Sequence, residues 1–171
     1  MRTILRHLLA IAVLPFTVTV LVPVWITRGN GVTPRIGSTP LEIGLQISGV
    51  ALLAAGVALF GSSLRRFATD GKGTLAPWDP PRELVVSGPY GYVRNPMISG
   101  VVITLYAESM LLLSQDQFVW ATLFLGVNSI YIPWVEEQGL EVRFGDAYRQ
   151  YRINVPVLIP RLRPWRPPHT P

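Results

Sequence analysis

The feature that most constrains this chain is a series of long segments without charged side chains. Four segments share this property, apart from Glu108 in the third: His7–Thr27, Ile43–Leu64, Pro96–Leu113 and Gln117–Val135. A helix needs roughly 20 apolar residues to cross the hydrocarbon core of a bilayer, which is about 30 Å thick. Charged residues make up only 15% of the chain, against roughly 25% in soluble proteins. The sequence therefore predicts an all-α, polytopic membrane protein with about four transmembrane helices, in a single domain over residues 1–171.

The first segment has two interpretations. Arg2 and Arg6 precede its apolar residues, as in a cleavable signal peptide. The segment is long, however, and it has no convincing small-x-small cleavage site, which favours a retained span. Pro15 and Pro23 are expected to kink this helix, and membrane helices tolerate such kinks.

Two features of the next segments have alternative interpretations. Small residues recur at helical spacing in the second segment, where they either allow close helix packing or simply fill an apolar helix: Gly44, Ser48, Ala51, Ala55 and Ala58. Glu108 interrupts the third segment, and a carboxylate at such a depth is costly. This glutamate is either functional or a protonated or hydrogen-bonded structural residue near the far interface.

The connections between the segments set the predicted topology. Only Ser114–Asp116 separates the third span from the fourth, so these two helices must be antiparallel. With four spans, all but two of the 15 lysines and arginines lie on one side of the membrane, the exceptions being Arg28 and Arg35. The positive-inside rule places that side and both termini in the cytoplasm, as expected for a bacterial inner-membrane protein. This topology accounts for the net charge of +5, and no nucleic-acid partner is expected.

The longer polar connections are expected to lie on the cytoplasmic side. Residues 65–94 are rich in proline but also contain aromatic and apolar residues, which indicates a structured cytoplasmic loop before the third span. After the fourth span, Gly145–Asp146 marks a helix stop and restart, and Ala147–Asn154 is expected to form a cytoplasmic C-terminal helix. The Pro/Arg tail, Arg161–Pro171, is expected to fray.

The start of the third span is also a candidate binding site. Asn95 is a good N-cap, and Pro96 fits the first helical position. With Arg94 beside them, the free N–H groups form either an ordinary capped helix start or a site for an anionic ligand group. The fourth span is expected to end on the same side at Glu136–Glu137, where two acids oppose the helix dipole. These acids either pair with nearby arginines or accept hydrogen bonds from a ligand.

The residue types present exclude several kinds of chemistry. The chain contains no cysteine, which rules out disulfides, thiolate ligands and a cysteine nucleophile. No metal site is predicted. No residue stands out as a general base, so the catalytic residues are unassigned at this stage.

Three ordered motifs lie within residues 74–161. The first is Leu84–Ile98, which ends in Gly-Pro-Tyr-Gly-Tyr-Val-Arg-Asn-Pro-Met-Ile, and the second is the pair Glu136–Glu137. The third motif contains Phe144, Gly145, Tyr148, Tyr151, Val155, Pro156 and Pro160. Together they resemble the membrane methyltransferases of the isoprenylcysteine carboxyl methyltransferase and phospholipid methyltransferase group. That group has Gly-x-Tyr-x-x-x-Arg-His-Pro-x-Tyr, then a glutamate pair, then Phe-Gly-x-x-Tyr-x-x-Tyr and Val-Pro-x-x-x-Pro; some bacterial members have Asn for the His, as here.

The resemblance implies an S-adenosylmethionine-dependent methyltransferase without a Rossmann domain. In the group, the loop before the third span, the Arg-His-Pro turn and the glutamate hold the cofactor on the cytoplasmic face. The expected cofactor-binding residues are Arg82, Glu83, Leu84, Val85, Tyr90, Arg94, Asn95, Pro96, Met97, Ile98, Glu136 and Glu137. By hypothesis, the helix start and Arg94 suit the carboxylate of the cofactor, and Glu136 suits its ammonium or ribose diol. Tyr90 or Trp78 could stack on its adenine ring.

Two departures from the group's pattern bear on the substrate. Ile98 stands at the motif's usual Tyr position, and Ile132 stands where the eukaryotic prenylcysteine enzymes have an arginine for the substrate carboxylate. The expected function is methyl transfer to a lipidic or small amphiphilic acceptor at the cytoplasmic membrane face. The alternatives are phospholipid N-methylation, S-methylation of a small thiol, and a non-catalytic membrane scaffold. The acceptor and the oligomeric state stay open.

Overall fold

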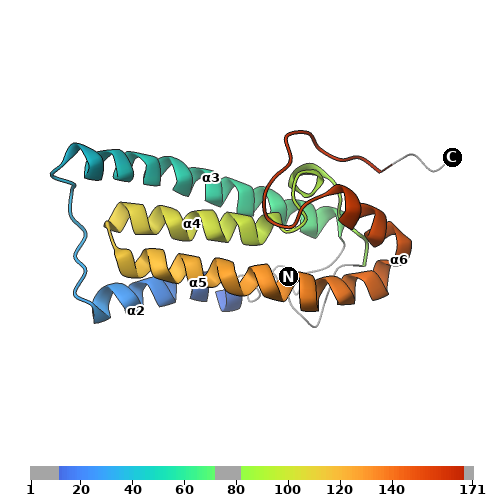
Figure 1. Cartoon of the computed structure of the whole chain (residues 1–171), viewed down its shortest axis with the longest axis horizontal. Coiled ribbons are helices and arrows are strands. Elements are labelled where there is room, and N and C mark those ends of the chain that lie inside the picture. Colours follow the sequence, from blue (N-terminus) through green and yellow to red (C-terminus); the bar gives the residue numbers. More distant parts are fainter. Residues whose placement is uncertain (1–11, 72–81, 168–171) are drawn as a thin grey trace. The chain divides into compact units, whose positions relative to one another are not determined.

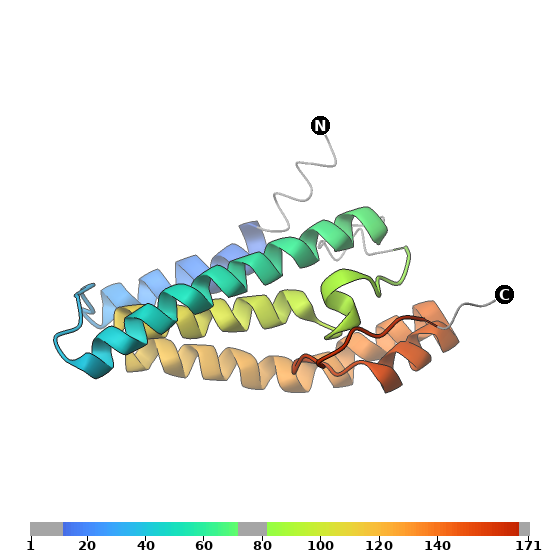
Figure 2. The same cartoon turned by 90° about the horizontal axis from the view of Figure 1, so that it is seen from above.

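The computed structural model describes residues 12–71 and 82–167, and the ordered elements in these residues are all helical (Figures 1 and 2). In chain order they are η1 Ala12–Leu21, α2 Val22–Gly29, α3 Pro40–Asp70, η2 Gly88–Gly91, α4 Pro96–Leu112, α5 Gln115–Tyr131, η3 Ile132–Glu136 and α6 Glu137–Asn154. Elements η1 and η3 are π-helical, and η2 is a 3₁₀ turn. The prediction of an all-α chain is confirmed for the described residues. Trp78 and the first residues of the predicted first span lie outside them.

The chain divides into two compact units. Unit 1 contains Met1–Ala58 and Gly100–Gly126, and unit 2 contains Leu59–Ser99 and Val127–Pro171. Helices α3, α4 and α5 each begin in one unit and end in the other. The single domain expected from the sequence stays a prediction.

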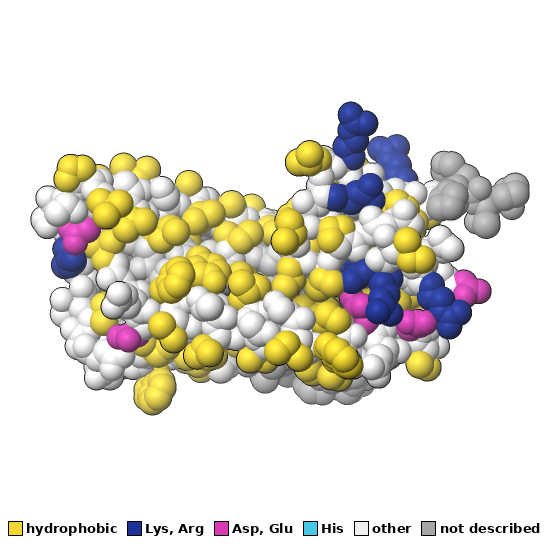
Figure 3. Space-filling view, in the orientation of Figure 1, with side chains coloured by type: hydrophobic (Ala, Val, Ile, Leu, Met, Phe, Trp, Pro, Cys, Tyr) yellow, Lys and Arg dark blue, Asp and Glu magenta, His cyan; other side chains and the backbone are white. Residues whose placement is uncertain are grey.

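Two helices in the described residues are long and apolar enough to cross a membrane. They are Pro40–Asp70 and the helical stretch Gln115–Asn154, whereas the apolar Pro96–Leu112 is shorter. The most apolar window of Pro40–Asp70 has a mean hydropathy of 2.1, yet only 11% of it is buried within the protein. A core helix of a soluble protein would be mostly buried, so this exposed apolar surface is typical of a helix in lipid. Figure 3 shows apolar side chains, in yellow, along the visible surface of α3 and α5.

In unit 1, two glycines allow α3 to pack closely against α4. A Cβ added at Gly56 would lie 2.6 Å from Thr104 Oγ1 and 2.9 Å from the carbonyl oxygen of Gly100. A Cβ at Gly49 would lie 3.2 Å from the carbonyl oxygen of Ala107. Gly49 and Gly56 are both buried and stand seven residues apart, so they share one face of α3.

The close-packing interpretation of the other small residues of α3 is wrong. The five residues concerned are all exposed: Gly44, Ser48, Ala51, Ala55 and Ala58. A Cβ added at Gly44 would meet no atom within 4 Å. Helix α3 therefore carries two small-residue faces, and periodicity alone does not show which of them has a partner.

The predicted antiparallel pair is confirmed in unit 1, where α4 and α5 lie side by side (Figures 1 and 2). The rings of Tyr106 and Phe118 are 5.4 Å apart, and Tyr106 Oη lies 3.2 Å from Thr122 Oγ1. The turn between the helices places Leu113 in the left-handed region, with φ 50°. Such a conformation costs a non-glycine residue free energy, which the packing on either side must offset.

Two predicted helix ends are wrong, and both corrections bear on the site. Helix α3 continues past Arg65 and Arg66 to Asp70, so these arginines belong to a helix and not to the predicted loop. The helix of the fourth span does not end at Glu136–Glu137 but continues into α6 as far as the kink at Gly145. Pro133, which has no N–H to donate, does not end the helix of the fourth span. The chain accommodates this proline by a π turn over Ile132–Glu136, and the helix continues after it.

The predicted stop and restart at Gly145 is confirmed as a sharp kink. Gly145 has φ 55° and ψ −131°, a conformation that an L-residue with a Cβ rarely adopts. The helical residues after the kink carry Tyr148 and Tyr151, which are buried in unit 2. The kink therefore turns the end of α6 back toward the core of its own unit.

Candidate functional site

Two sequence-distant motifs meet in unit 2. Asn95 Nδ2 lies 3.2 Å from Glu136 Oε2 and 3.4 Å from Glu136 Oε1, across a sequence separation of 41 residues. Asn95 immediately precedes α4, and Glu136 ends the π turn η3. The predicted approach of the Arg-Asn-Pro segment to the glutamate pair is thus confirmed. Because a π turn shifts the side chains that follow it, Glu136 owes its direction in part to Pro133.

Asn95 donates its side-chain amide to a carboxylate and its backbone N–H to a segment near the C-terminus. That N–H binds the carbonyl oxygen of Val157 at 3.2 Å, and the preceding N–H of Arg94 binds that of Pro156 at 2.8 Å. Ser99 Oγ also approaches the carbonyl oxygen of Leu158. The start of α4 is therefore covered on one side by main-chain carbonyl groups.

We call residues 155–167 the C-terminal strap. The backbone N–H of Trp165 donates to the carbonyl oxygen of Gly91 at 2.8 Å, and the backbone N–H of Arg161 donates to that of Tyr92 at 3.0 Å. A Cβ at Gly91 would lie 3.2 Å from Trp165 O, so the absence of a side chain permits this contact. The indole of Trp165 lies 5.7 Å from the ring of Tyr151. The prediction of fraying from Arg161 onward is therefore wrong as far as Trp165, because backbone bonds and aromatic contacts hold the strap.

Glu137 forms a buried ion-pair network. Its side chain is only 2% exposed, and its two oxygens lie 2.7 Å from Arg94 Nη2 and 3.2 Å from Arg152 Nε. The guanidinium of Arg94, itself 10% exposed, also donates to the carbonyl oxygen of Arg152. Of the two explanations for the acid pair, pairing with arginines holds for Glu137. It follows that Arg94 is already neutralised by the protein.

Glu136 has different surroundings. It is partly buried, and within residues 12–71 and 82–167 no lysine or arginine forms an ion pair with it. The partner of its carboxylate in this part of the chain is the uncharged amide of Asn95. A partly buried carboxylate without a compensating cation is costly, and a cationic or hydroxyl-bearing ligand group would lower that cost.

Tyr90 places a hydroxyl group in the same unit with no partner. The residue is 7% exposed, and its buried Oη makes no hydrogen bond to any of the described residues. Burial raises the pKa of the Tyr90 phenol well above its usual range, and the nearby Tyr151 and Glu136 raise it further. The phenol therefore stays protonated as a hydrogen-bond donor. Its main chain is fixed, because Tyr151 Oη donates to the carbonyl oxygen of Tyr90 at 2.7 Å.

Several other residues of the predicted set support this site by packing. Val85 and Met97 form a buried cluster with Tyr90, and Phe60 and Phe67 of α3 pack against it. Leu84 packs on a second cluster of Tyr148, Tyr151 and Val155. Pro96 is buried and Ile98 is half-buried. Phe60 and Phe67 are not among the predicted site residues, although their spacing of seven residues on an apolar helix places them on one face.

Arg82 and Glu83 lie at the edge of the described residues. Both are exposed, and their N–H groups lie 2.8 and 3.3 Å from the carbonyl oxygen of Gly71. In the part of the chain that the structure describes, no contact joins Arg82 to Asn95 or Glu136. No cluster of potential metal ligands is found among the described residues.

Comparison with known proteins places this geometry in a family. Residues 45–147 match the family model of the phospholipid methyltransferases. The chain belongs to the phospholipid methyltransferase family. The match includes both Asn95 and Glu136, so the contact between them lies within the part that defines the family. The resemblance inferred from the sequence is confirmed.

A curated relative is similar to part of the chain. Methanethiol S-methyltransferase 1 of Bradyrhizobium diazoefficiens is 35% identical over 80 residues, which are 45% of this chain and 25% of that protein. The aligned part thus spans about a quarter of the relative's length. No solved structure is significantly similar.

Proposed function

We propose that this member of the phospholipid methyltransferase family transfers a methyl group from S-adenosylmethionine to a lipidic or small amphiphilic acceptor at the cytoplasmic membrane face. The observation that carries the proposal is the contact of Asn95 with Glu136, at 3.2 Å. It joins two motifs of the family at a carboxylate that no basic residue in the described part of the chain neutralises. Such a carboxylate suits the ammonium group or the ribose hydroxyls of the cofactor.

Each candidate residue of unit 2 would have a separate role in binding the cofactor. Glu136 would accept hydrogen bonds from the ammonium or diol, and the unpartnered hydroxyl of Tyr90 would donate to the ligand. In the first turn of α4, Met97 and Ile98 would offer their backbone N–H groups to the ligand carboxylate. Arg94 and Glu137 would act together by holding this turn in place, because each already binds the other.

Bound S-adenosylmethionine would supply an already electrophilic methyl group. The chain's own contribution is then to orient the ligand and to exclude water, effects that lower the barrier without a charged catalytic group. The buried cluster of Val85, Tyr90 and Met97 provides an apolar surface suited to that task. No residue is assigned as a general base.

The proposal includes a topology. Four transmembrane helices in a single domain would place both termini, the segment before α4 and the residues of α6 after Gly145 in the cytoplasm, and the membrane would be a bacterial inner membrane. The distribution of basic residues supports this arrangement, since only Arg28 and Arg35 fall on the opposite side. The water-soluble cofactor would then enter from the cytoplasm, and the acceptor from the bilayer.

Isothermal titration with S-adenosylmethionine, on protein in nanodiscs, tests the cofactor assignment. Glu136→Gln should bind about tenfold more weakly or worse, since a charge-assisted hydrogen bond contributes roughly 1.5–3 kcal/mol. Asp146→Asn is the matched control, because Asp146 is 91% exposed in α6. Unchanged affinity in Glu136→Gln would remove Glu136 from the site. Absence of any binding by the unmodified protein would favour a non-catalytic scaffold.

Two acceptor classes have specific support. Membership of the phospholipid methyltransferase family favours a phospholipid, and the similarity to a methanethiol S-methyltransferase favours a small thiol. A prenylcysteine carboxylate has less support, because Ile132 is buried and apolar. Incubation with methyl-labelled cofactor, followed by thin-layer separation of lipids and analysis of volatile thioethers, distinguishes the first two. Label in the lipid fraction would exclude the thiol as the main acceptor, and label in the volatile fraction would exclude the lipid.

A further inference from the structure

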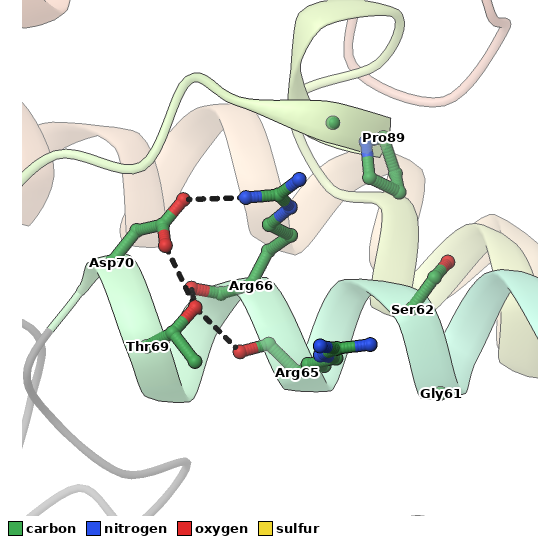
Figure 4. Close-up of a pocket in the computed structure, with 8 residues that line it drawn as sticks. Gly61, Ser62, Arg65, Arg66, Thr69, Asp70 and Pro89 are labelled. Atoms are coloured by element: carbon green, nitrogen blue, oxygen red, sulfur yellow. Dashed lines mark hydrogen bonds and ion pairs between the residues drawn. The ribbon is translucent and has the colours of Figure 1, made fainter.

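Unit 2 contains a pocket that none of the predicted site residues lines. Its volume is about 750 Å³, and its walls are formed by the end of α3 and the start of the η2 turn (Figure 4). The lining residues are Gly61, Ser62, Arg65, Arg66, Thr69, Asp70, Gly88 and Pro89. A pocket of this size is sufficient for a small ligand or a lipid headgroup.

The charges in the pocket are arranged asymmetrically. Arg66 Nη1 lies 3.6 Å from Asp70 Oδ2, and Ser87 Oγ also donates to that oxygen. Thr69 Oγ1 donates to Asp70 Oδ1 at 2.7 Å, so the acid already has three partners. Figure 4 shows no interaction of the Arg65 guanidinium, and no acidic side chain of the described residues pairs with it. The lining residues therefore carry a net positive charge, with one arginine available for an anion.

The position of Arg65 and Arg66 along α3 indicates which kind of anion the pocket would bind. The uncharged run Ile43–Leu64 ends directly before Arg65, and it is about 33 Å long at a rise of 1.5 Å per residue. This length matches the hydrocarbon core of a bilayer, which is about 30 Å thick. In the proposed topology, Arg65 and Arg66 would therefore lie at the level of the lipid phosphates.

We propose that this pocket binds the phosphate group of an anionic membrane phospholipid, with Arg65 as the main contact. Arginine is well suited to the role, since its planar guanidinium can donate two parallel hydrogen bonds to a phosphate. Pro89 lines the pocket, and the next residue, Tyr90, belongs to the candidate cofactor site. A bound headgroup would thus contact the same short turn that presents Tyr90. The proposal does not depend on the identity of the methyl acceptor.

Native mass spectrometry of the full-length protein in detergent, titrated with phosphatidylglycerol or phosphatidylcholine, tests the proposal. The first phosphatidylglycerol should bind more tightly than phosphatidylcholine, and Arg65→Gln should weaken it about tenfold, as expected for loss of one charge-assisted contact. Arg163→Gln removes the same charge from an exposed residue of the strap, outside the pocket, and should leave the affinity unchanged. Equal affinities for Arg65→Gln and the unmodified protein would overturn the proposal.

A second variant tests the pocket without changing its charge. A Cβ at Gly61 meets no atom within 4 Å, so Gly61→Leu is expected to fold and to fill the opening. It should weaken the first phosphatidylglycerol to the same extent as Arg65→Gln. Full affinity in Gly61→Leu would overturn the assignment to this pocket. Competition by inorganic phosphate at equal concentration would overturn the lipid assignment, because it would show that the acyl chains contribute nothing.

Discussion

The adjacent acids Glu136 and Glu137 have different surroundings, which suggests that Glu136 serves ligand binding and Glu137 serves stability. Glu137 is buried between two arginines, whereas the described partner of Glu136 is the amide of Asn95. Burying the Glu137 carboxylate is tolerable only because the arginines compensate it. The sequence left the roles of the two acids open, since both lie in the same motif. The side chains' directions, set by the π turn at Pro133, resolve the ambiguity.

Substituting each acid separately should therefore give opposite results. Glu137→Gln leaves Arg94 buried without a full counter-charge, and it should lower the free energy of unfolding by about 3 kcal/mol. Glu136→Gln should leave stability unchanged or slightly raised, because it removes an uncompensated charge. Urea unfolding in detergent micelles, followed by circular dichroism, measures both variants. An equal loss of stability in the two variants would contradict this assignment.

Substituting Tyr90 and Tyr151 by phenylalanine should likewise have different effects on stability and on cofactor affinity. Tyr90→Phe removes a buried hydroxyl that has no hydrogen-bond partner within residues 12–71 and 82–167, so stability should be unchanged or higher. The affinity for S-adenosylmethionine should fall several-fold. Tyr151→Phe removes the 2.7 Å hydrogen bond to the carbonyl oxygen of Tyr90 and should lower stability by about 1–2 kcal/mol. Thermal unfolding and calorimetric titration of both variants give the two readouts. Normal cofactor affinity in Tyr90→Phe would remove its hydroxyl from the site.

At the scale of elements, sequence patterns indicated which helices form but less well where they end. The apolar segments predicted helices α3 and α4, and the short connection after α4 predicted that α4 and α5 are antiparallel. The runs did not show that α3 continues to Asp70, because its last turns have polar and charged residues that are equally typical of a loop. The strap was missed because its bonds to residues 91–95 are main-chain contacts, which side-chain chemistry does not encode.

The packing of α3 on α4 in unit 1 gives a matched pair of glycine variants. Gly56→Ala would place a Cβ 2.6 Å from Thr104 Oγ1 and should lower stability by about 1–3 kcal/mol. Gly44→Ala meets no atom and should raise stability by roughly 0.5–1 kcal/mol, because alanine favours a helix. Unfolding of the two variants under identical detergent conditions tests the prediction. Equal shifts in both would contradict the close approach at Gly56.

At the scale of the whole molecule, the distribution of basic residues makes the topology testable. The chain contains no cysteine, so a single introduced thiol reports the location of one residue without interference. Ile36 lies in the connection between α2 and α3 and is 89% exposed, and Asp146 lies in α6 and is 91% exposed. The proposed orientation puts the first in the periplasm and the second in the cytoplasm.

Labelling of intact cells with a membrane-impermeant maleimide should therefore modify Ile36→Cys but not Asp146→Cys. After the inner membrane is permeabilised, Asp146→Cys should react as fully as Ile36→Cys, which controls for the accessibility of each thiol. Labelling of Asp146→Cys in intact cells would place α6 outside the cytoplasm. The candidate cofactor site would then be separated from the cytoplasmic pool of S-adenosylmethionine, because Glu136 directly precedes α6. The proposed function depends on this orientation as much as on the contact between Asn95 and Glu136.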